Sequence, residues 1–254
     1  MPGSKHPPIA IGFVVLERES VTTEREWADA VQAWVPGAGP IDGFSAGDRV
    51  ISFSLDGHDV IVGLMGAPIP WSDLEGPAAT SWRWRTATAE LQKSQAHAIV
   101  TLTGGGGTLI ERSLLLTRLL AAATQAFGAI GVFWGPGTVV LSSAMLQEEV
   151  QEATLERLPI LAWNEFRIER LPDGTANILT TGLEHFSCME IEMIGFTLPL
   201  GDMIDLFLGI SRLLLSGEVF RDGDTVGPDA ETKLETRHAK SAWGREPPVL
   251  RIEG

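Results

Sequence analysis

The chain has 254 residues, no tyrosine and one cysteine, Cys188. Without tyrosine, no phenol can serve as an acid, a base or a nucleophile. A single cysteine excludes an internal disulfide and any cysteine-rich zinc site. A lone thiol also suits a reducing compartment. We therefore expect a cytoplasmic protein that is not held together by disulfides.

Basic residues are scarce in this sequence. Lysine and arginine number 19 against 33 aspartates and glutamates, which gives a net charge of −14 and a pI near 4.7. Binding to nucleic acid needs clustered lysine and arginine, so this balance argues against a nucleic-acid partner. Hydrophobic residues make up 44% of the chain, which is enough for a packed core and excludes general disorder.

Long uninterrupted hydrophobic runs are also missing. The longest apolar stretch, Met189–Leu215, is broken by charged residues and by Pro199, whereas a membrane span needs roughly 20 apolar residues. The first apolar run ends at Glu17 without a small-residue cleavage site, so we interpret Ile9–Leu16 as a buried first strand and not as a signal peptide. The sequence thus predicts no membrane partner.

Periodicity predicts helices and strands that alternate along the chain. Thr23 is the predicted cap of the first helix, Asp56-Gly57 a hairpin turn, and Gly128 the end of a long helix. The predicted helices are 23–34, 109–127, 143–158 and 202–215. The predicted strands are 9–16, 49–55, 59–65, 97–103, 129–134, 160–170, 175–183, 187–196 and, as a last edge strand, 248–252.

This order of elements predicts an α+β fold in which helices pack on a mainly antiparallel sheet. Each half of the chain reads as strand, helix and hairpin, which suggests a pseudo-duplicated architecture, although residue-level similarity between the halves is faint. No low-complexity linker separates them, so we expect one compact unit over residues 1–254. The subdivision considered is an N-terminal part, 1–95, and a second part, 96–254.

The glycine run Gly104–Gly107 lies between a predicted strand and a predicted helix, where backbone N–H groups could cradle an anion. The lysine of a P-loop is missing, and the spacing does not fit the dinucleotide-binding pattern. We interpret the run as a flexible connection and predict no phosphate site and no cofactor.

One group of side chains has the composition of a chemical site. If 187–196 is a strand, Cys188, Glu190 and Glu192 share one face, and His185 lies close by. A thiol, two carboxylates and an imidazole could bind a metal ion or transfer protons. The other interpretation is a half-exposed strand with a solvated acidic face.

Negative charge is concentrated between Gln147 and Glu192, where ten acids and three arginines give −7, half of the net charge. Such asymmetry attracts basic partners, although it can also serve solubility alone. Trp134, at the end of a predicted buried strand, either lines a concavity or is an ordinary core aromatic. The predicted partner-binding residues are Glu148, Glu149, Glu152, Glu165, Glu169, Glu190, Glu192 and Trp134.

Several sequence blocks, taken in order, resemble an uncharacterised bacterial family known only as a domain of unknown function. The resemblance runs from about Ala96 to the C-terminus and implies a bacterial, cytosolic α+β protein, with no established catalytic residues to carry over. The blocks are His97–Thr101, Gly128–Trp134, Thr180–Leu183 with Phe186, Glu190 with Glu192, and Arg221–Gly227.

Two hypotheses of function follow. The first is an acidic protein-binding module, most concretely an immunity or adaptor protein of a bacterial toxin or secretion system, which binds a basic surface of a toxin or effector. The second is a metal-dependent or hydrolytic enzyme that uses His185, Cys188, Glu190 and Glu192.

Overall fold

The computed structural model describes residues 9–227 and 232–254, and it divides into two compact units. The first unit comprises residues up to 135 and 139–162, and the second comprises 136–138 and 163–254. The boundary does not fall at 95/96, because the strand that begins at Ala96 pairs with strands of the N-terminal part. Each unit is described by itself.

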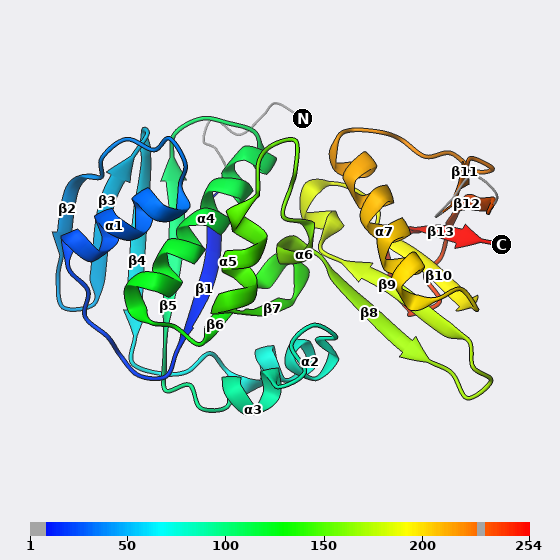
Figure 1. The fold of residues 1–254 in the computed structure, drawn as a ribbon, viewed down its shortest axis with the longest axis horizontal. Helices are drawn as coiled ribbons and strands as arrows, with labels where there is room; N and C mark the ends of the chain where they lie inside the picture. The colour runs from blue at the N-terminus through cyan, green and yellow to red at the C-terminus, as the bar shows by residue number, and fades with distance from the viewer. Residues whose placement is uncertain (1–8, 228–231) are drawn as a thin grey trace. The chain divides into compact units, whose positions relative to one another are not determined.

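The first unit is built on a seven-stranded sheet in the order β2-β3-β4-β5-β1-β6-β7, and all its neighbouring strands are antiparallel (Figure 1). Its strands are β1 (Ala10–Leu16), β2 (Asp42–Ala46), β3 (Val50–Leu55), β4 (His58–Met65), β5 (Ala96–Gly104), β6 (Gly131–Trp134) and β7 (Val139–Ser142). Its helices are α1 (Glu24–Trp34), α2 (Trp71–Thr80), α3 (Ala87–Leu91), α4 (Leu109–Phe127) and α5 (Ser143–Gln151), and the short α6 (Ile160–Trp163) lies at the boundary.

Local sequence signals explain where these elements begin and end. Thr23 and Thr108 each start a helix with a capping box, in which a glutamate three residues later returns a hydrogen bond to the cap backbone. Asp56 and Gly57 both have positive φ, as a two-residue hairpin turn between β3 and β4 requires. Gly128 ends α4 in the left-handed conformation. These predictions are confirmed.

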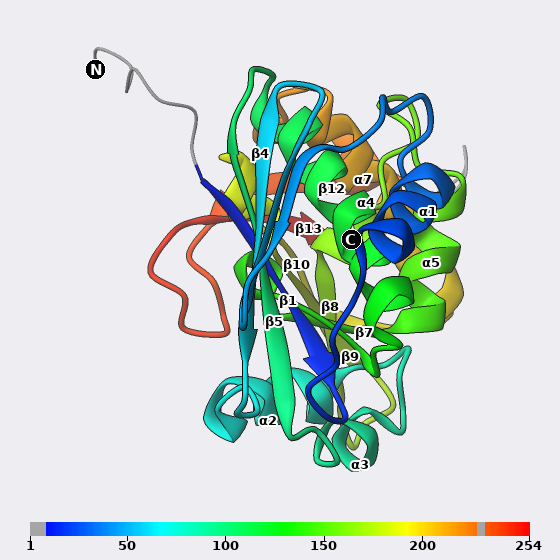
Figure 2. The same cartoon turned by 90° about the vertical axis from the view of Figure 1, so that its left-hand side faces the viewer.

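Helices α1, α4 and α5 cover one face of this sheet, as Figure 2 shows from the side. The strands send alternate residues into this layer, and the ring of Trp27 on α1 contacts Phe53 of β3 at a centroid distance of 5.4 Å. On the opposite face, α2 and α3 pack against a smaller core that includes Val15 and Val140. That smaller core lies towards one end of the sheet.

The second unit contains a six-stranded sheet in the order β11-β12-β13-β10-β9-β8. Its elements are β8 (Glu165–Arg170), β9 (Ala176–Thr181), the 3₁₀ turn η2 (Leu183–Phe186), β10 (Ile191–Phe196), α7 (Leu200–Leu215), β11 (Thr225–Val226), β12 (Leu234–Ala239) and β13 (Val249–Glu253). Another 3₁₀ turn, η1 (Gly135–Gly137), lies at the boundary.

Strand β13 occupies the middle of this second sheet, parallel to β10 and antiparallel to β12. The prediction of an edge strand at 248–252 is therefore wrong in its position, because β11 and β12 were not recognised in the charged, glycine-rich segment before it. The predicted α+β class with mainly antiparallel sheet is confirmed. The two sheets differ in strand order, which does not agree with a duplicated architecture.

None of the helices described within residues 9–227 and 232–254 combines the length and the apolar character that a membrane crossing requires.

Candidate functional site: an uncovered sheet face and two buried glutamates

Among the described residues of the first unit, helices α2 and α3 cover only part of the sheet face opposite α1 and α4. We define the open face by three rows of side chains that cross β3, β4, β5 and β1 opposite α1 and α4. The rows follow from the strand register and are Asp42, Ser54, Asp59 and Thr103; then Ser52, Ile61, Thr101 and Ile11; then Val50, Gly63, Ile99, Phe13 and, on β6, Phe133.

The second and third rows of the open face expose several large apolar side chains. Ile61 and Ile11 are 40% and 41% exposed, and Val50 is 51% exposed. Phe13 and Phe133 are half-buried and lie with their ring centroids 5.9 Å apart. An antiparallel sheet with one solvated face normally alternates apolar and polar residues so that the wet face is polar. Contiguous exposed apolar side chains instead mark interaction surfaces.

Strand β1 is fully buried on one face only, whereas the sequence predicts burial on both. Its continuous apolar run predicts burial on both faces, and the structure buries Val14 and Leu16 under the helices. Ile11, however, projects from the other face and is exposed. The signal that could have located this surface is the apolar run itself, because it leaves β1 without a polar face.

Negative charge lies in the first row of the open face. The register places Asp42 and Asp59 on either side of Ser54, whose hydroxyl donates to Asp59 Oδ1 at 3.0 Å. Both aspartates are exposed, and within the described part of the chain neither is in an ion pair. The two apolar rows carry no charged side chain. The open face therefore has a polar, acidic row at the end nearest the β3–β4 turn and two uncharged rows that contain its exposed apolar side chains.

His97 adds one oriented polar group beside the apolar rows. Its Nδ1 lies 2.7 Å from the carbonyl oxygen of Ala67, and its ring centroid is 6.4 Å from that of Phe13. A carbonyl can only accept a hydrogen bond, so Nδ1 donates. In the neutral ring, Nε2 is then a hydrogen-bond acceptor.

Glu190, one of the predicted site residues, is 1% exposed and serves the second unit internally. Its Oε2 accepts a hydrogen bond from the Thr180 hydroxyl at 2.7 Å, and its Oε1 accepts from the backbone N–H groups of Gly182 and Glu184 at 2.7 and 3.2 Å. Gly182 is required here because its φ is 134° and a Cβ would lie 2.2 Å from the carbonyl oxygen of Trp163. The carboxylate thus fastens the turn at η2 to the sheet.

Glu192 is fully buried, and it too has a complete set of partners. Arg251 Nε donates to Oε1 at 3.0 Å, while the Ser241 hydroxyl and the Ala242 N–H donate to Oε2 at 2.7 and 3.0 Å. The parallel register places Glu192 directly beside Arg251. Glu192 therefore holds the loop after β12 against the sheet.

The expected solvated acidic face at Glu190 and Glu192 is wrong. Glu190 lies just before β10 and Glu192 lies within it. Both are buried, because η2 and the loop after β12 supply their hydrogen-bond partners. Period-two patterning assigns two residues to one face and cannot say which face is buried.

The metal-centre alternative is not supported by the geometry. Within residues 9–227 and 232–254, no three His, Cys, Asp or Glu side chains are placed to hold a metal ion together. The ring of His185 lies edge-on to Phe186, and burial lowers the pKa of His185. Burial, and then the Glu190 carboxylate, raises the pKa of the Cys188 thiol, which makes it a poor nucleophile at neutral pH.

Two other predicted partner-binding residues are also inaccessible. Trp134 is 2% exposed and is a core aromatic, and Glu165 is buried at the start of β8. Neither can contact a partner from the folded protein, so the sequence-based assignment of these two residues to a binding surface is wrong.

Of the remaining predicted acids, Glu148, Glu152 and Glu169 are accessible and Glu149 is mostly buried; their role in binding stays a prediction. Glu149 forms an ion pair with Arg83 at 2.8 Å. Glu152 pairs with Arg157. Glu169 is exposed and accepts from Asn177 Nδ2 at 2.9 Å. Since Glu169 belongs to the second unit and the others to the first, the acidic stretch is divided between the units.

The glycine run is a structural connection, as the sequence predicts. The buried Arg112 donates to the carbonyl oxygens of Gly104 and Leu102 at 2.6 and 3.2 Å. At the start of α4, the Thr108 N–H donates to the carboxylate of Glu111 at 2.6 Å, and this hydrogen bond lowers the pKa of Glu111. The protein's own carboxylate thus lies where an anion would bind.

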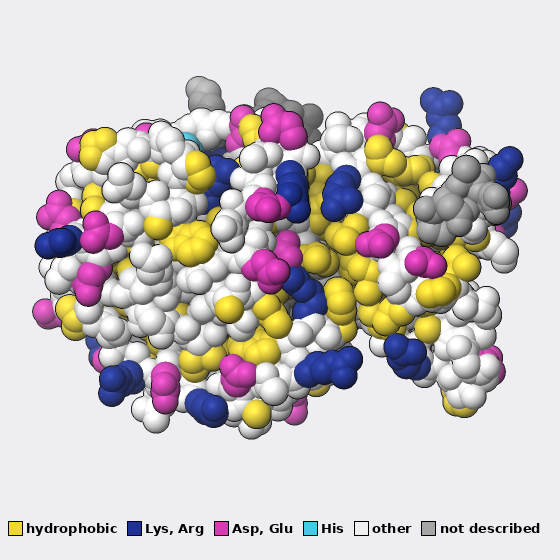
Figure 3. Space-filling model, in the orientation of Figure 1, with side chains coloured by type: hydrophobic (Ala, Val, Ile, Leu, Met, Phe, Trp, Pro, Cys, Tyr) yellow, Lys and Arg dark blue, Asp and Glu magenta, His cyan; other side chains and the backbone are white. Residues whose placement is uncertain are grey.

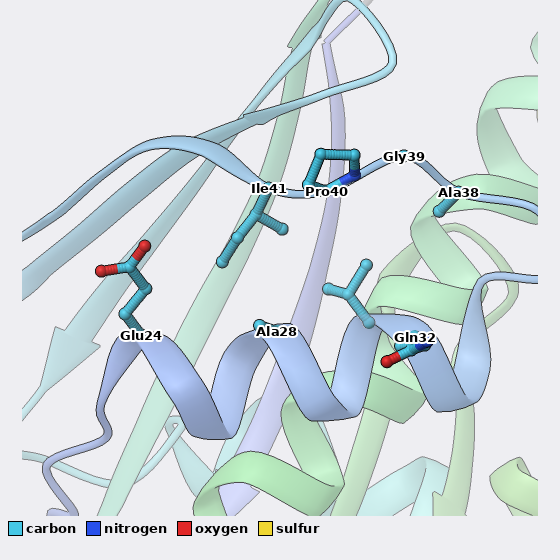
Figure 4. Close-up of a pocket in the computed structure, with 8 residues that line it drawn as sticks. Glu24, Ala28, Gln32, Ala38, Gly39, Pro40 and Ile41 are labelled. Carbon is cyan, nitrogen blue, oxygen red and sulfur yellow. The ribbon is translucent and has the colours of Figure 1, made fainter.

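Two hollows lie outside the open face. One of about 430 Å³ lies between α1 and the segment 38–41, where Glu24 and Gln32 lie at opposite ends with Ala28 between them (Figure 4). Neither polar group is part of a catalytic arrangement.

The other hollow, of about 630 Å³, lies along α7 and contains Leu213 and Phe220. Figure 3 shows apolar side chains gathered over this helix. Nothing in the second unit indicates what would occupy it.

Residues 179–253 match a family model described as a domain of unknown function, DUF4261. The resemblance to a domain-of-unknown-function family is thereby confirmed, over a shorter range than the sequence blocks suggest. No curated protein and no solved structure matches the chain.

Within the matched range, the structure connects two of the sequence blocks. Thr180 and Gly182 of one block both donate hydrogen bonds to Glu190 of the other. These blocks therefore have a structural explanation that needs no active site.

Proposed function

We propose that this protein is a protein-binding module and that the open face of the first unit is its binding surface. The observation that carries the proposal is the group of exposed apolar side chains Ile11, Ile61 and Val50 in two neighbouring rows of a sheet whose other face is covered by helices. A solvated sheet face has no structural need for these residues, whereas a partner gains free energy by burying them.

The charge of the chain supports a basic partner. The net charge of −14 favours encounter with positively charged proteins, and Asp42 and Asp59 place carboxylates at one end of the apolar rows. A basic bacterial toxin or effector is a partner of this chemistry. An immunity or adaptor protein of a toxin or secretion system, acting in the cytoplasm, is the specific form of the proposal.

The test is affinity capture from a bacterial lysate with matched variants. The double variant Ile11→Thr/Ile61→Thr removes apolar surface from the open face while keeping β-branched residues in the strands. The control Leu155→Thr/Ile194→Thr changes residues that are 50% and 41% exposed and lie outside that face. Captured proteins are quantified by mass spectrometry.

We expect at least one protein to be captured equally by the wild type and the control and to fall at least tenfold with the open-face variant. If every captured protein is retained by the open-face variant, or if none is captured at all, the proposal is wrong.

A further inference from the structure

We infer that the open face accepts an amphipathic α-helix of a basic partner, with one large apolar side chain seated over Gly63 and lysine or arginine beside Asp42 and Asp59. This inference rests on the proposed function and identifies the partner element that the face fits. It follows from the size of the face, from the hollow at Gly63 and from the position of the charges.

The dimensions of the uncovered area suit one helix. From Asp59 to Met65, β4 runs about 20 Å at roughly 3.3 Å per residue, which is the length of a helix of about 13 residues at 1.5 Å each. Strands β3, β4, β5 and β1 are neighbours. At about 4.8 Å per step they span roughly 14 Å, slightly more than the diameter of one helix.

The rest of the same face indicates a helix and not a second sheet. Helices α2 and α3 already pack on this side, against the core at Val15 and Val140. A helix laid beside them would extend an existing helical layer, whereas a sheet would end against those two helices. The apolar rows are exposed where that layer stops.

Gly63 supplies the seat for a large side chain. It lies in the middle of β4, paired with Val50 on one side and Ile99 on the other. Along the strand its same-face neighbours are Ile61 and Met65, which are 40% and 43% exposed. A Cβ built on Gly63 would have no atom within 4 Å, so the space above its backbone is open, and the nearest residues of the same face are apolar. Glycine weakens a strand interior and often marks a place where another chain approaches closely.

The charges set the direction of the helix. Asp42 and Asp59 lie at the end of the face near the β3–β4 turn, and the opposite end carries Met65 and His97, which pair with each other. Basic residues of the partner are therefore expected at the Asp59 end. The N-terminus of the helix is also favoured there, because its dipole is positive.

The test is a displayed library of 14-residue peptides randomised at every position and selected against the full-length protein, with counter-selection against Gly63→Val. The inference predicts enriched peptides with apolar residues at i, i+3, i+4 and i+7 and with basic residues near one end. A labelled peptide from this pool is then titrated by fluorescence anisotropy.

Gly63→Val should weaken binding of that peptide at least tenfold while leaving the melting temperature equal or higher, because valine fits a strand and nothing occupies its space. Gly63→Ala, which fills less of the hollow, should have an intermediate effect. The control Gly201→Val, at an equally open glycine of α7, should bind as the wild type does. Asp42→Asn/Asp59→Asn should weaken binding severalfold and reduce its salt dependence.

Enrichment of peptides that alternate apolar and polar residues, the absence of any enrichment, or binding that Gly63→Val does not change would overturn the inference. These results leave the proposed function standing if the lysate capture still depends on Ile11 and Ile61. Loss of that dependence removes the proposed function itself.

Discussion

The two sheets of this protein place apolar and charged side chains in opposite ways. In the first unit, the isoleucines of the open face are accessible to solvent. In the second unit, the carboxylates of Glu190 and Glu192 are buried. Both arrangements run against the average preference of apolar residues for the interior and of carboxylates for water.

The comparison distinguishes residues with a structural role, the buried glutamates, from residues that we propose to be functional, the exposed isoleucines. The buried carboxylates have hydrogen-bond donors on both oxygens, so their burial is explained within the unit. Phe13 and Phe133 pack against the smaller core under α2 and α3, but Ile11, Ile61 and Val50 remain exposed among the residues that the structure describes. A buried carboxylate whose oxygens all accept hydrogen bonds has a structural role. An apolar side chain that stays exposed to solvent indicates a surface for a partner.

The largest expected effect is that of Glu192→Ala. Removing this carboxylate leaves the largely buried Arg251 without its ion-pair partner, although it still donates to the carbonyl oxygen of Lys240. The Ser241 hydroxyl loses its acceptor as well. Breaking a buried charged pair from one side costs about 3–5 kcal/mol. Chemical denaturation followed on the second unit measures the loss of unfolding free energy.

The matched control is Glu253→Ala, which breaks the exposed pair with Arg237. Such pairs contribute about 1 kcal/mol or less. Equal losses of unfolding free energy in the two variants would show that Glu192 does not stabilise the second unit and would refute its structural role.

Glu190→Gln should have a smaller effect, about 1–3 kcal/mol, because the amide keeps one acceptor oxygen but loses the charge. The N–H groups of Gly182 and Glu184 should lose protection from hydrogen exchange, since both donate to Oε1. Glu184→Gln is the control, because that side chain is exposed and pairs with Arg245. Unchanged exchange at Gly182 would contradict the assigned role.

The open-face variant Ile11→Thr/Ile61→Thr should change the unfolding free energy of the first unit by no more than about 1 kcal/mol, as is usual for exposed positions. Binding of an apolar dye such as ANS should fall at the same time. Thermal and urea denaturation give the first quantity and dye fluorescence the second. A loss as large as that of Glu192→Ala would mean that these isoleucines belong to the core.

The smallest expected effect concerns acid stability at Asp222. Hydrogen bonds from the backbone and then the ring of His238 lower the pKa of Asp222, so its carboxylate stabilises the folded state above the ordinary aspartate pKa of about 3.9. This contribution is lost as the pH falls through the lowered pKa. The melting temperatures of wild type and Asp222→Asn should differ slightly at pH 7 and converge below about pH 4. A constant difference at every pH would refute the assignment.

Much of the fold was predictable because its signals are local. The cap at Thr108, the glycine at 128 and the apolar period between them define α4 without reference to the rest of the chain. The turn at Asp56-Gly57 similarly defines β3 and β4. Strand β12 (Leu234–Ala239) has no local signal, because it is short, contains charged side chains and is stabilised by pairing with β13.

The sites were less predictable because burial is not a local property. Period two groups Glu190 with Glu192, but Glu190 lies before β10, and the burial of Glu192 depends on Ser241 and Arg251, about fifty to sixty residues later. The exposure of Ile11 likewise depends on the absence of a covering helix. A single sequence reports which residues share a face and is silent about what packs against it.

The central position of β13 has a consequence for synthesis of the chain. The first unit has all of its strands once Ser142 has been made, whereas β11 and β12 join the second sheet only through β13, which ends at Glu253. At roughly 5–20 residues per second on the ribosome, the interval between these two points is on the order of ten seconds. During that interval the strands of the first sheet are all present, whereas the antiparallel pair β11 and β12 has no strand to join.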